Sequence, residues 1–380
     1  MKVAIFTDTY TPQVNGVAKT LERWTKYLKK QNIDYRLFTP HIRGCHSNSE
    51  EIRTSLSLPF WLYPECRLAL PKPSKIRAAL EAFQPDLIHI VTPFTMGLTG
   101  LYFGKKMDIP MVGSYHTHFH QYLDYYRLSF LSRYNWKYMR WFHKSFQITF
   151  VPSEETRRHL ETQGFMDIKL WKRGVDSYFF HPYQNEESIR RIYKIEEPYI
   201  LSYVGRLARE KGLDVLMQTA EKLPHSIKQN VHWIIVGNGP MYRKLKQNAP
   251  TNMTFTGYQE NERLSQIYAC SDLFVFPSAT ETFGNVVLES LASGTPAIVA
   301  RSGGVQEIVQ DGITGYLCEA EQSDSFVSAI STLLSQPALR KEMSRAARTY
   351  AQSQRWDLIF DQLLLDYQET VQVYSLDKDA

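Results

Sequence analysis

Two glutamates stand eight positions apart in the segment Ser278–Ala300, which reads SATETFGNVVLESLASGTPAIVA. Glu281 lies in a predicted loop, and Glu289 lies inside a predicted helix that begins at Gly284-Asn285. A loop carboxylate can accept hydrogen bonds from sugar hydroxyls, and the N-terminus of the helix can hold a phosphate. A second carboxylate can hold ribose hydroxyls, as acidic residues do in dinucleotide folds. The alternative for Glu289 is a plain surface position, but its apolar neighbours predict a mostly buried helix, where an unpaired carboxylate is costly.

Two cations flank a turn in VGRLAREKG, residues 204–212, directly after a predicted strand. Arg206 can bind a diphosphate in a bidentate manner, and Lys211 can act on it as a point charge. Such a pair would also stabilise a departing nucleoside diphosphate. Solvated surface cations are the alternative reading.

Two further segments follow predicted strands. In PQVNGVAKT, residues 12–20, Gly16 has no Cβ, so a phosphate can approach the backbone and the positive end of the next helix. A simple tight turn is the alternative. The segment GSYHTHFHQYLDYY places His116, His118 and His120 within five positions. Alternate residues after a strand point to opposite sides, and no acidic or cysteine cluster completes a ligand set, so we expect no metal site and favour one histidine as a sugar or acceptor contact.

Short apolar strands alternating with amphipathic helices must position these side chains. This pattern predicts an α/β fold of two Rossmann-like domains with parallel doubly wound sheets, whose ligands lie outside the carboxyl ends of the strands. The strand–helix rhythm breaks near residues 173–188, and the domains are predicted as 1–175 and 176–354. The predicted strands cover residues 2–7, 34–40, 85–93, 109–117, 147–153, 168–174, 198–207, 230–240, 252–258, 271–278 and 295–300.

Composition limits the function classes. A net charge of +5 over 380 residues suits anionic ligands or an anionic membrane surface, but it is too small to indicate nucleic acid binding. The four cysteines are scattered without a CxxC pair, which argues against zinc and favours a reducing cytosol. The N-terminal residues read as a strand and not as a signal peptide, and no window is apolar enough to span a membrane. We therefore expect a cytoplasmic protein whose membrane contact, if any, is peripheral.

The segment 127–146, RLSFLSRYNWKYMRWFHKSF, mixes basic and aromatic residues at helical spacing. Such a helix can lie on the anionic inner face of a membrane. An ordinary amphipathic helix with one buried face and long cationic side chains along its edges is the alternative, and it is slightly favoured.

The ordered set of motifs resembles the retaining glycosyltransferases of the GT-B fold known as glycosyltransferase family four. ETFGNVVLE matches the E-x7-E signature of that family. The segments NGV, YHTH, VPSEETRRHL, RGVD, GRLAREKG, VGNGP and FTGY agree with it in order, so the resemblance covers nearly the whole chain. It implies two domains facing a central cleft, with a final helix, residues 355–380, that returns to the first domain.

The resemblance also implies roles for matching positions. Glu281 would contact the hydroxyls of the donor sugar, and Glu289 would hold the ribose. His116 would lie near the reacting carbon. The remaining contacts would be made to diphosphate, sugar and base by Gly16, Arg206, Lys211, Tyr258, Phe283, Gly284 and Asn285. Transfer would retain the anomeric configuration without a metal or other cofactor, and the leaving diphosphate would assist the acceptor hydroxyl.

DTYTPQVNGVAKTL and YHTHFHQYLDYY look most like the branch of the family that glycosylates lipids, although some of its members carry an acidic residue where His118 stands. The expected activity is transfer of a hexose from a nucleotide diphosphate sugar to a lipid or glycolipid. A UDP-sugar is favoured, with GDP-mannose as the second choice. A soluble or polysaccharide acceptor, a sugar-nucleotide epimerase and a non-catalytic sugar-binding protein stay open as alternatives.

Overall fold

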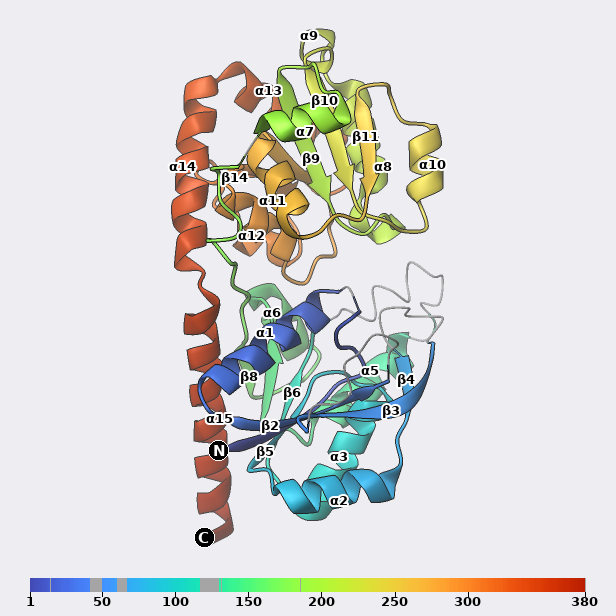
Figure 1. Ribbon diagram of the computed structural model, residues 1–380, viewed down its shortest axis with the longest axis vertical. Coiled ribbons are helices and arrows are strands. Elements are labelled where there is room, and N and C mark those ends of the chain that lie inside the picture. Colours follow the sequence, from blue (N-terminus) through green and yellow to red (C-terminus); the bar gives the residue numbers. More distant parts are fainter. Residues whose placement is uncertain are drawn as a thin grey trace. The chain divides into compact units, whose positions relative to one another are not determined.

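The computed structural model describes residues 1–13, 15–41, 50–59, 67–116, 130, 132–184 and 186–379. The chain divides into two compact units (Figure 1). Unit 1 combines Met1–Lys172 with Asp357–Ala380, and unit 2 is the continuous stretch Arg173–Trp356.

Unit 1 is built on an eight-stranded sheet of order β4-β3-β2-β1-β5-β6-β7-β8. All neighbouring strands are parallel except β3 and β4, which pair antiparallel at one edge. The strands are β1 Lys2–Phe6, β2 Asp34–Pro40, β3 Ile52–Pro59, β4 Arg67–Leu70, β5 Leu87–Ile90, β6 Met111–Ser114, β7 Ile148–Val151 and β8 Ile168–Leu170. The helices are α1 Gly16–Lys30, α2 Pro73–Phe83, α3 Thr95–Met107, α5 Ser132–His143, α6 Glu154–Thr162 and α15 Trp356–Asp379.

The central strands of unit 1 form its core because they are apolar on both faces. Every residue of β5, β6 and β7 is buried. Phe6 of β1 stacks on Phe38 of β2 with ring centroids 4.5 Å apart. Helix α1 begins where the Asn15 side chain accepts a hydrogen bond from the Ala18 backbone amide at 2.8 Å, a standard N-cap.

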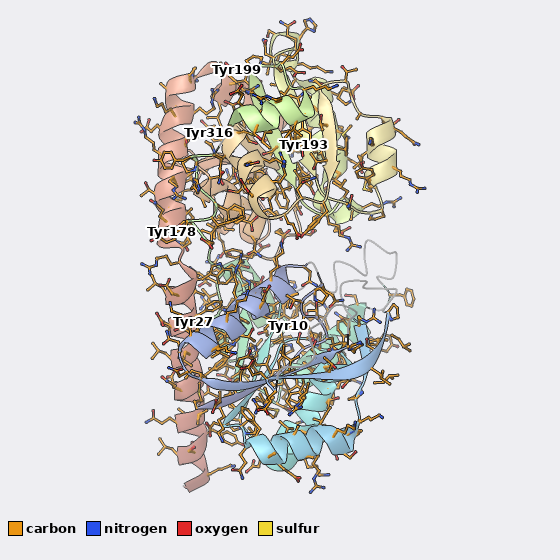
Figure 2. The ribbon with its side chains drawn as sticks, viewed as in Figure 1. Tyr10, Tyr27, Tyr178, Tyr193, Tyr199 and Tyr316 are labelled. Atoms are coloured by element: carbon orange, nitrogen blue, oxygen red, sulfur yellow. The ribbon has the colours of Figure 1, made fainter. Side chains whose placement is uncertain are left out.

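Helix α15 packs on unit 1 although it lies at the far end of the sequence. Tyr27 of α1, labelled in Figure 2, donates a hydrogen bond to Asp361. Lys169 forms an ion pair with Asp366 at 2.9 Å. Tyr367 is fully buried, and its hydroxyl lies 2.5 Å from Nδ1 of His89 in β5. These contacts make the last helix part of the core of unit 1.

Unit 2 is built on a six-stranded parallel sheet of order β11-β10-β9-β12-β13-β14. Its strands are β9 Tyr199–Val204, β10 Val231–Val236, β11 Met253–Gly257, β12 Leu273–Phe276, β13 Ala297–Ala300 and β14 Gly315–Cys318. Its helices are α7 Glu186–Tyr193, α8 Leu213–Lys222, α9 His225–Lys228, α10 Tyr242–Gln247, α11 Asn261–Cys270, α12 Asn285–Ala292, α13 Ser323–Ser335 and α14 Pro337–Ser353, with short 3₁₀ helices η2 Arg209–Lys211 and η3 Gly304–Glu307.

The predicted fold class, two α/β domains with parallel sheets, is confirmed. Each predicted strand has a counterpart in the structure, but three strands were not predicted. These are β3, β4 and β14, all at or next to an edge of a sheet. No helix among the described residues is long and apolar enough to cross a membrane.

Candidate active site

The loops at the carboxyl edge of the unit 2 sheet are tied to one another. Parallel strands end at the same edge, so the loops after β9, β12 and β13 meet there. The carbonyl of Glu210, in η2, accepts hydrogen bonds from the hydroxyls of Ser278 at 3.3 Å and Thr280 at 2.9 Å. The hydroxyl of Ser302 donates to the carbonyl of Ala279 at 2.9 Å. Three sequence-distant segments therefore form one framework.

An ion pair joins two of the predicted site residues on this framework. Lys211 Nζ lies 2.7 Å from Glu281 Oε2. Their side chains are 15% and 22% exposed, so the pair is partly shielded from water but open to a ligand. Partial shielding strengthens a charge pair relative to one on an open surface. A cation and an acceptor therefore stand side by side where a charged, hydroxyl-rich substrate would need both.

The backbone around Glu281 is fixed by glycines that the loop requires. Gly284 has a φ of 98°, in the left-handed region that favours glycine. Gly303 also has a positive φ, 67°, and a Cβ there would lie 2.5 Å from the Glu281 carbonyl oxygen. The Gly304 amide donates to that same carbonyl at 2.7 Å. The sequence analysis missed this second loop. The Gly303-Gly304 pair, which begins three residues after the end of β13, was the signal that could have found it.

Helix α12 places Glu289 beside the buried Tyr268. The Tyr268 hydroxyl donates to Glu289 Oε2 at 3.2 Å, and the carboxylate side of α12 is only partly buried. Tyr268 itself is fully buried, and burial together with the neighbouring carboxylate raises its pKa well above the usual range. The hydrogen bond from Tyr268 thus holds Glu289 in a defined position, unlike a plain surface glutamate. Its side is only partly buried, which leaves room for a ligand.

The start of α12 presents polar groups. Its N-cap, Gly284, supplies no side-chain hydrogen bond. The Oδ1 atom of Asn285 is buried and has no hydrogen-bond partner among the described residues. A buried acceptor without a partner is costly unless a ligand or water meets it. Phe283, just before the helix, packs partly buried against the core of unit 2.

Arg206 and Tyr258 lie at the same edge but make different contacts. The backbone carbonyl of Arg206 accepts from the Tyr203 hydroxyl at 3.2 Å, which fixes the turn after β9. Tyr258 follows β11, is 41% exposed, and donates to Glu260 at 3.1 Å. Burial, the Glu260 carboxylate and the charge of Glu289 together raise the pKa of Tyr258 to about 12. Tyr258 therefore stays a neutral ring with an open face near Glu289.

The remaining predicted site residues belong to unit 1. Gly16 is the first residue of α1, directly after the N-cap. His116 lies two residues after β6, and its ring meets the buried Trp171 edge-on at a centroid distance of 5.2 Å. His118 and His120 lie outside the described residues.

Asp8 is a buried carboxylate that the sequence analysis did not assign. It follows β1, is fully buried, and accepts hydrogen bonds from the first turn of α3 and from two threonines. The donors are Thr92 Oγ1 at 2.8 Å, Thr95 Oγ1 at 3.1 Å, Met96 N at 2.9 Å and Gly97 N at 3.4 Å. Burial raises the pKa of Asp8 to about 6, against the lowering effect of these donors. Asp8 therefore fixes the loop before Gly16 and is not open to a ligand.

Helix α5 covers most of the described part of segment 127–146. Met139, Phe142 and His143 form its buried face. The outward residues are Arg133, Tyr134, Lys137, Arg140 and Trp141, with Tyr134 71% and Trp141 52% exposed. The helix has the buried face of an amphipathic helix and also a solvent face that mixes cations with aromatic rings.

Among the described residues, no group of three or more His, Cys, Asp or Glu side chains is placed to hold a metal ion.

Comparisons with known proteins agree with this architecture. Residues 14–178 match the family model described as Glycosyltransferase Family 4, and residues 184–350 match the model described as Glycosyl transferases group 1. A GDP-mannose-dependent alpha-mannosyltransferase of Corynebacterium glutamicum is 30% identical over 98% of this chain and 89% of its own length. The sulfoquinovosyl transferase SQD2 of Arabidopsis thaliana is 31% identical over 93% of this chain and 71% of its own.

Further similarities extend to another relative and to solved structures. An alpha-monoglucosyldiacylglycerol synthase of Streptococcus pneumoniae is 30% identical over 84% of this chain and 76% of its own. The structure of Anabaena HepE in complex with UDP superposes with a TM-score of 0.80 at 18% identity, covering 97% of this chain and all of HepE. Sucrose-phosphate synthase from Thermosynechococcus elongatus gives a TM-score of 0.79 at 20% identity, covering 97% and 98% of the two chains.

The two parallel-sheet units and these similarities define a glycosyltransferase with the GT-B fold, an enzyme of the hexosyltransferase class. Within that class, the chain belongs to glycosyltransferase family 4.

Proposed function

We propose that the enzyme transfers a hexose from a nucleotide diphosphate sugar to a hydroxyl of a lipid or glycolipid acceptor. The observation that carries this proposal is the Lys211–Glu281 pair at the carboxyl edge of the unit 2 sheet. Glu289 lies on α12, the helix that follows the Glu281 loop. A cation, a sugar-hydroxyl acceptor and a ribose acceptor are the three groups that a nucleotide diphosphate sugar requires. Two relatives, named as a sulfoquinovosyl transferase and an alpha-monoglucosyldiacylglycerol synthase, support the lipid acceptor.

The two units would divide the work. Unit 2 would bind the donor, because it holds the charged and hydroxyl-accepting groups. Unit 1 corresponds to the predicted domain 1–175 together with the final helix 355–380, and this domain would bind the acceptor. Gly16, at the start of α1, offers a backbone amide and a helix N-terminus to phosphate oxygens. His116 would contact the donor sugar near its reacting carbon.

The family resemblance and the contacts within unit 2 support the following donor roles. Glu281 would accept hydrogen bonds from hydroxyls of the sugar, while Glu289 would accept hydrogen bonds from the two ribose hydroxyls. Arg206 and Lys211 would bind the diphosphate, and Lys211 would then share its charge between the ligand and Glu281. The amides after Phe283 and Gly284 and the side chain of Asn285 would meet sugar and phosphate, and the ring of Tyr258 would lie against the base.

The proposed chemistry needs neither a metal nor another cofactor. The bond between the anomeric carbon and the diphosphate oxygen breaks as the acceptor oxygen forms its bond on the same face, so the configuration is retained. The acceptor proton passes to an oxygen of the leaving diphosphate. Arg206 and Lys211 stabilise the negative charge that develops on that diphosphate in the transition state.

Two finer points belong to the same proposal. A UDP-sugar is the favoured donor and GDP-mannose the second choice; a structural neighbour solved with UDP and relatives named for GDP-mannose support these two options. The solvent face of α5, with its cations and aromatic rings, would rest on an anionic membrane surface on the cytoplasmic side.

A thermal-shift titration of the full chain against UDP, GDP and ADP tests the donor site. A nucleotide that binds only the folded state at 100 times its Kd adds about 2.7 kcal/mol to the free energy of unfolding. We expect a clear shift with UDP or GDP and little with ADP. Transfer from the matching radiolabelled UDP- or GDP-hexose to diacylglycerol in detergent then tests the acceptor. An isomerised donor with no transfer would support an epimerase instead.

A further inference from the structure

A buried row of side chains connects helix α15 with the end of strand β6 inside unit 1. The hydroxyl of Tyr367, on α15, lies 2.5 Å from Nδ1 of His89 in β5. Nε2 of the same imidazole lies 2.7 Å from the hydroxyl of Ser114, the last residue of β6. All three side chains are buried. One imidazole therefore bridges the last helix of the chain and the strand that leads to His116.

Trp171 continues this row from His89 to His116. Its ring is buried, and the ring centroid lies 5.5 Å from that of His89 and 5.2 Å from that of His116. The planes of Trp171 and His116 meet at 61°, an edge-to-face arrangement that aromatic rings favour. We call Tyr367, His89 and Trp171 the ring chain. It begins on α15 and ends at His116.

Other rings enclose the ring chain on its remaining sides. The ring of Phe150, in β7, lies 6.2 Å from His89 and 6.1 Å from Tyr367, measured between centroids. Trp24 of α1 meets Tyr367 edge-on at 5.6 Å. Close-packed interiors have low compressibility and transmit strain. A displacement of α15 is therefore expected to travel along the ring chain and not to be absorbed beside it.

Ordinary core packing is the alternative, and two features favour a positioning role. His89 is the polar member of strand β5, LIHI, whose other residues are apolar, and a buried polar ring is costly unless its hydrogen bonds are made. The row also leaves the core, because His116 is only partly buried. A polar bridge inside the sheet thus leads to a side chain that a ligand can reach.

We propose that the ring chain sets the orientation of the His116 imidazole, so that Tyr367, His89 and Trp171 are positioning residues for hexose transfer. His116 is the group that would touch the donor sugar, and the other three act through it. This inference rests on the proposed function, in which His116 lies near the reacting carbon. Transfer then depends on the docking of α15 on unit 1, because the ring chain begins on that helix.

Transfer kinetics of the full chain test the proposal with three variants. Tyr367→Phe is the mildest, since it keeps the ring and removes only the hydroxyl that meets His89. Trp171→Leu removes the ring that meets His116, and Trp171→Phe restores an aromatic ring at the same position. Near-UV circular dichroism and the melting temperature confirm that each variant is folded.

The matched control is Tyr374→Phe. It is the same substitution on the same helix, and it also removes a hydroxyl contact with unit 1, since Tyr374 donates to Asp108 Oδ1 at 2.7 Å. This contact lies outside the ring chain. A loss of activity caused by weaker docking of α15 in general would appear in both tyrosine variants, whereas a loss specific to the ring chain would appear only in Tyr367→Phe.

We expect kcat to fall about 3- to 10-fold in Tyr367→Phe and about 10²-fold in Trp171→Leu, because slight misplacement of a contacting group has effects of this size. Trp171→Phe should recover part of the second loss. Tyr374→Phe should keep the wild-type kcat. The Kd for UDP and GDP should be unchanged in all four variants, because the ring chain contains none of the proposed nucleotide contacts. Wild-type kcat in both Tyr367→Phe and Trp171→Leu would overturn the proposal.

A double-mutant cycle with His116→Ala separates positioning from packing. If the ring chain acts through His116, Tyr367→Phe and Trp171→Leu should each lower kcat by less than about 2-fold once His116 is absent. A purely structural defect would lower kcat by the same factor with and without His116. Equal factors in the two backgrounds would therefore overturn the proposal.

Histidine NMR tests the same inference without activity. The ring signals of His116 are identified by their absence in His116→Ala. Two members of the ring chain separate Tyr367 from His116, so a shift of these signals in Tyr367→Phe, with none in Tyr374→Phe, reports transmission along the chain. Unchanged signals in Tyr367→Phe would contradict the proposal.

The NMR comparison also separates this inference from the proposed function. A wild-type chain that transfers no hexose, or a His116→Ala variant with wild-type kcat, would contradict the proposed function or the role of His116 in it. The NMR signals would still decide whether the ring chain orients His116. Normal transfer that depends on His116, together with His116 signals that ignore Tyr367→Phe, would contradict the ring chain alone.

Discussion

Asp8 in unit 1 and Glu281 in unit 2 both follow a parallel strand, at the sheet edge where α/β proteins bind ligands. Asp8 is fully buried and its two oxygens accept four hydrogen bonds from α3 and two threonines. Glu281 is 22% exposed, and its carboxylate forms an ion pair with Lys211 at 2.7 Å. One carboxylate is used by the fold, and the other keeps acceptor capacity for a substrate. Topological position alone does not distinguish structural from functional acids; the number of protein donors and the exposure do.

The largest expected effect concerns the exposed carboxylate, Glu281. Glu281→Gln keeps the size of the side chain but removes the charge that faces Lys211, and we expect transfer to fall about 10²–10³-fold, as for loss of one preorganised polar group. The melting temperature should change by only a few degrees, because the pair is near the surface. Steady-state kinetics with the radiolabelled donor measure the loss. Glu319→Gln, at an exposed site in the same unit, is the control. Wild-type turnover in the Glu281 variant would remove it from the site.

The buried carboxylate, Asp8, predicts a pH dependence of stability. The pKa of Asp8 is about 6 in the folded protein and 3.8 without perturbation, so the folded state binds this proton more tightly. The free energy of unfolding therefore decreases as the pH rises through this window, by about 3 kcal/mol for this one group. Urea unfolding of the wild type and of Asp8→Asn near pH 4 and near pH 7 measures it. The wild type should lose stability relative to the variant on going to the higher pH. An equal change in the free energy of unfolding of the two proteins would contradict the raised pKa of Asp8.

Lys211 sharpens the comparison because it forms the ion pair with the exposed acid, Glu281. Lys211→Ala should weaken UDP or GDP binding about 10- to 100-fold, the loss of a charge-assisted contact in a partly shielded site. Isothermal titration calorimetry measures the Kd. Lys222→Ala is the matched control, since Lys222 also forms an ion pair, with Asp324 at 2.9 Å, on helix α8 of the same unit. Equal losses in both variants would mean a general charge effect.

The smallest expected effect concerns Glu289, which accepts a hydrogen bond from Tyr268 and is only partly buried. Glu289→Gln can still accept from Tyr268, so the fold should be kept, while nucleotide affinity should fall about 10-fold through the ribose. The same titration with a 2′,3′-dideoxynucleotide provides the control. The variant and the wild type should bind that ligand equally. An equal loss for both ligands would place the ribose elsewhere.

Much of the fold was predictable from the sequence, because strands buried on both faces appear as apolar runs. Strand β5, LIHI, and strand β12, LFVF, are of this kind. Strand β3 is not, since IRTSLSLP alternates leucine with serine next to a sheet edge, and its partner β4 has only one buried residue. Strand β14, GYLC, has two buried residues and ends the other sheet. Edge strands lack the two-sided burial that makes a strand visible in a sequence.

The candidate site was predictable in its residue types but not in its pairings. Glu281 and Lys211 stood out because each follows a strand, and Glu289 stood out because it lies in a mostly apolar helix eight positions after Glu281. Nothing in the sequence showed that Lys211 would meet Glu281, seventy positions away, or that Tyr268 would meet Glu289. Asp8 looked no different from a ligand-binding acid, because its burial depends on α3 folding over it. Pairing and burial are long-range properties, and no local pattern contains them.

The return of α15 has a consequence for the order in which the protein is made. Unit 2 is one continuous stretch of chain, whereas unit 1 needs residues 357–380 to be complete. During synthesis, unit 2 can close its sheet while Trp24 and His89 still lack Phe360 and Tyr367, the rings that pack against them. Unit 1 is therefore the first to leave the ribosome and the last to finish folding, and until then its open core is the surface that a chaperone would recognise.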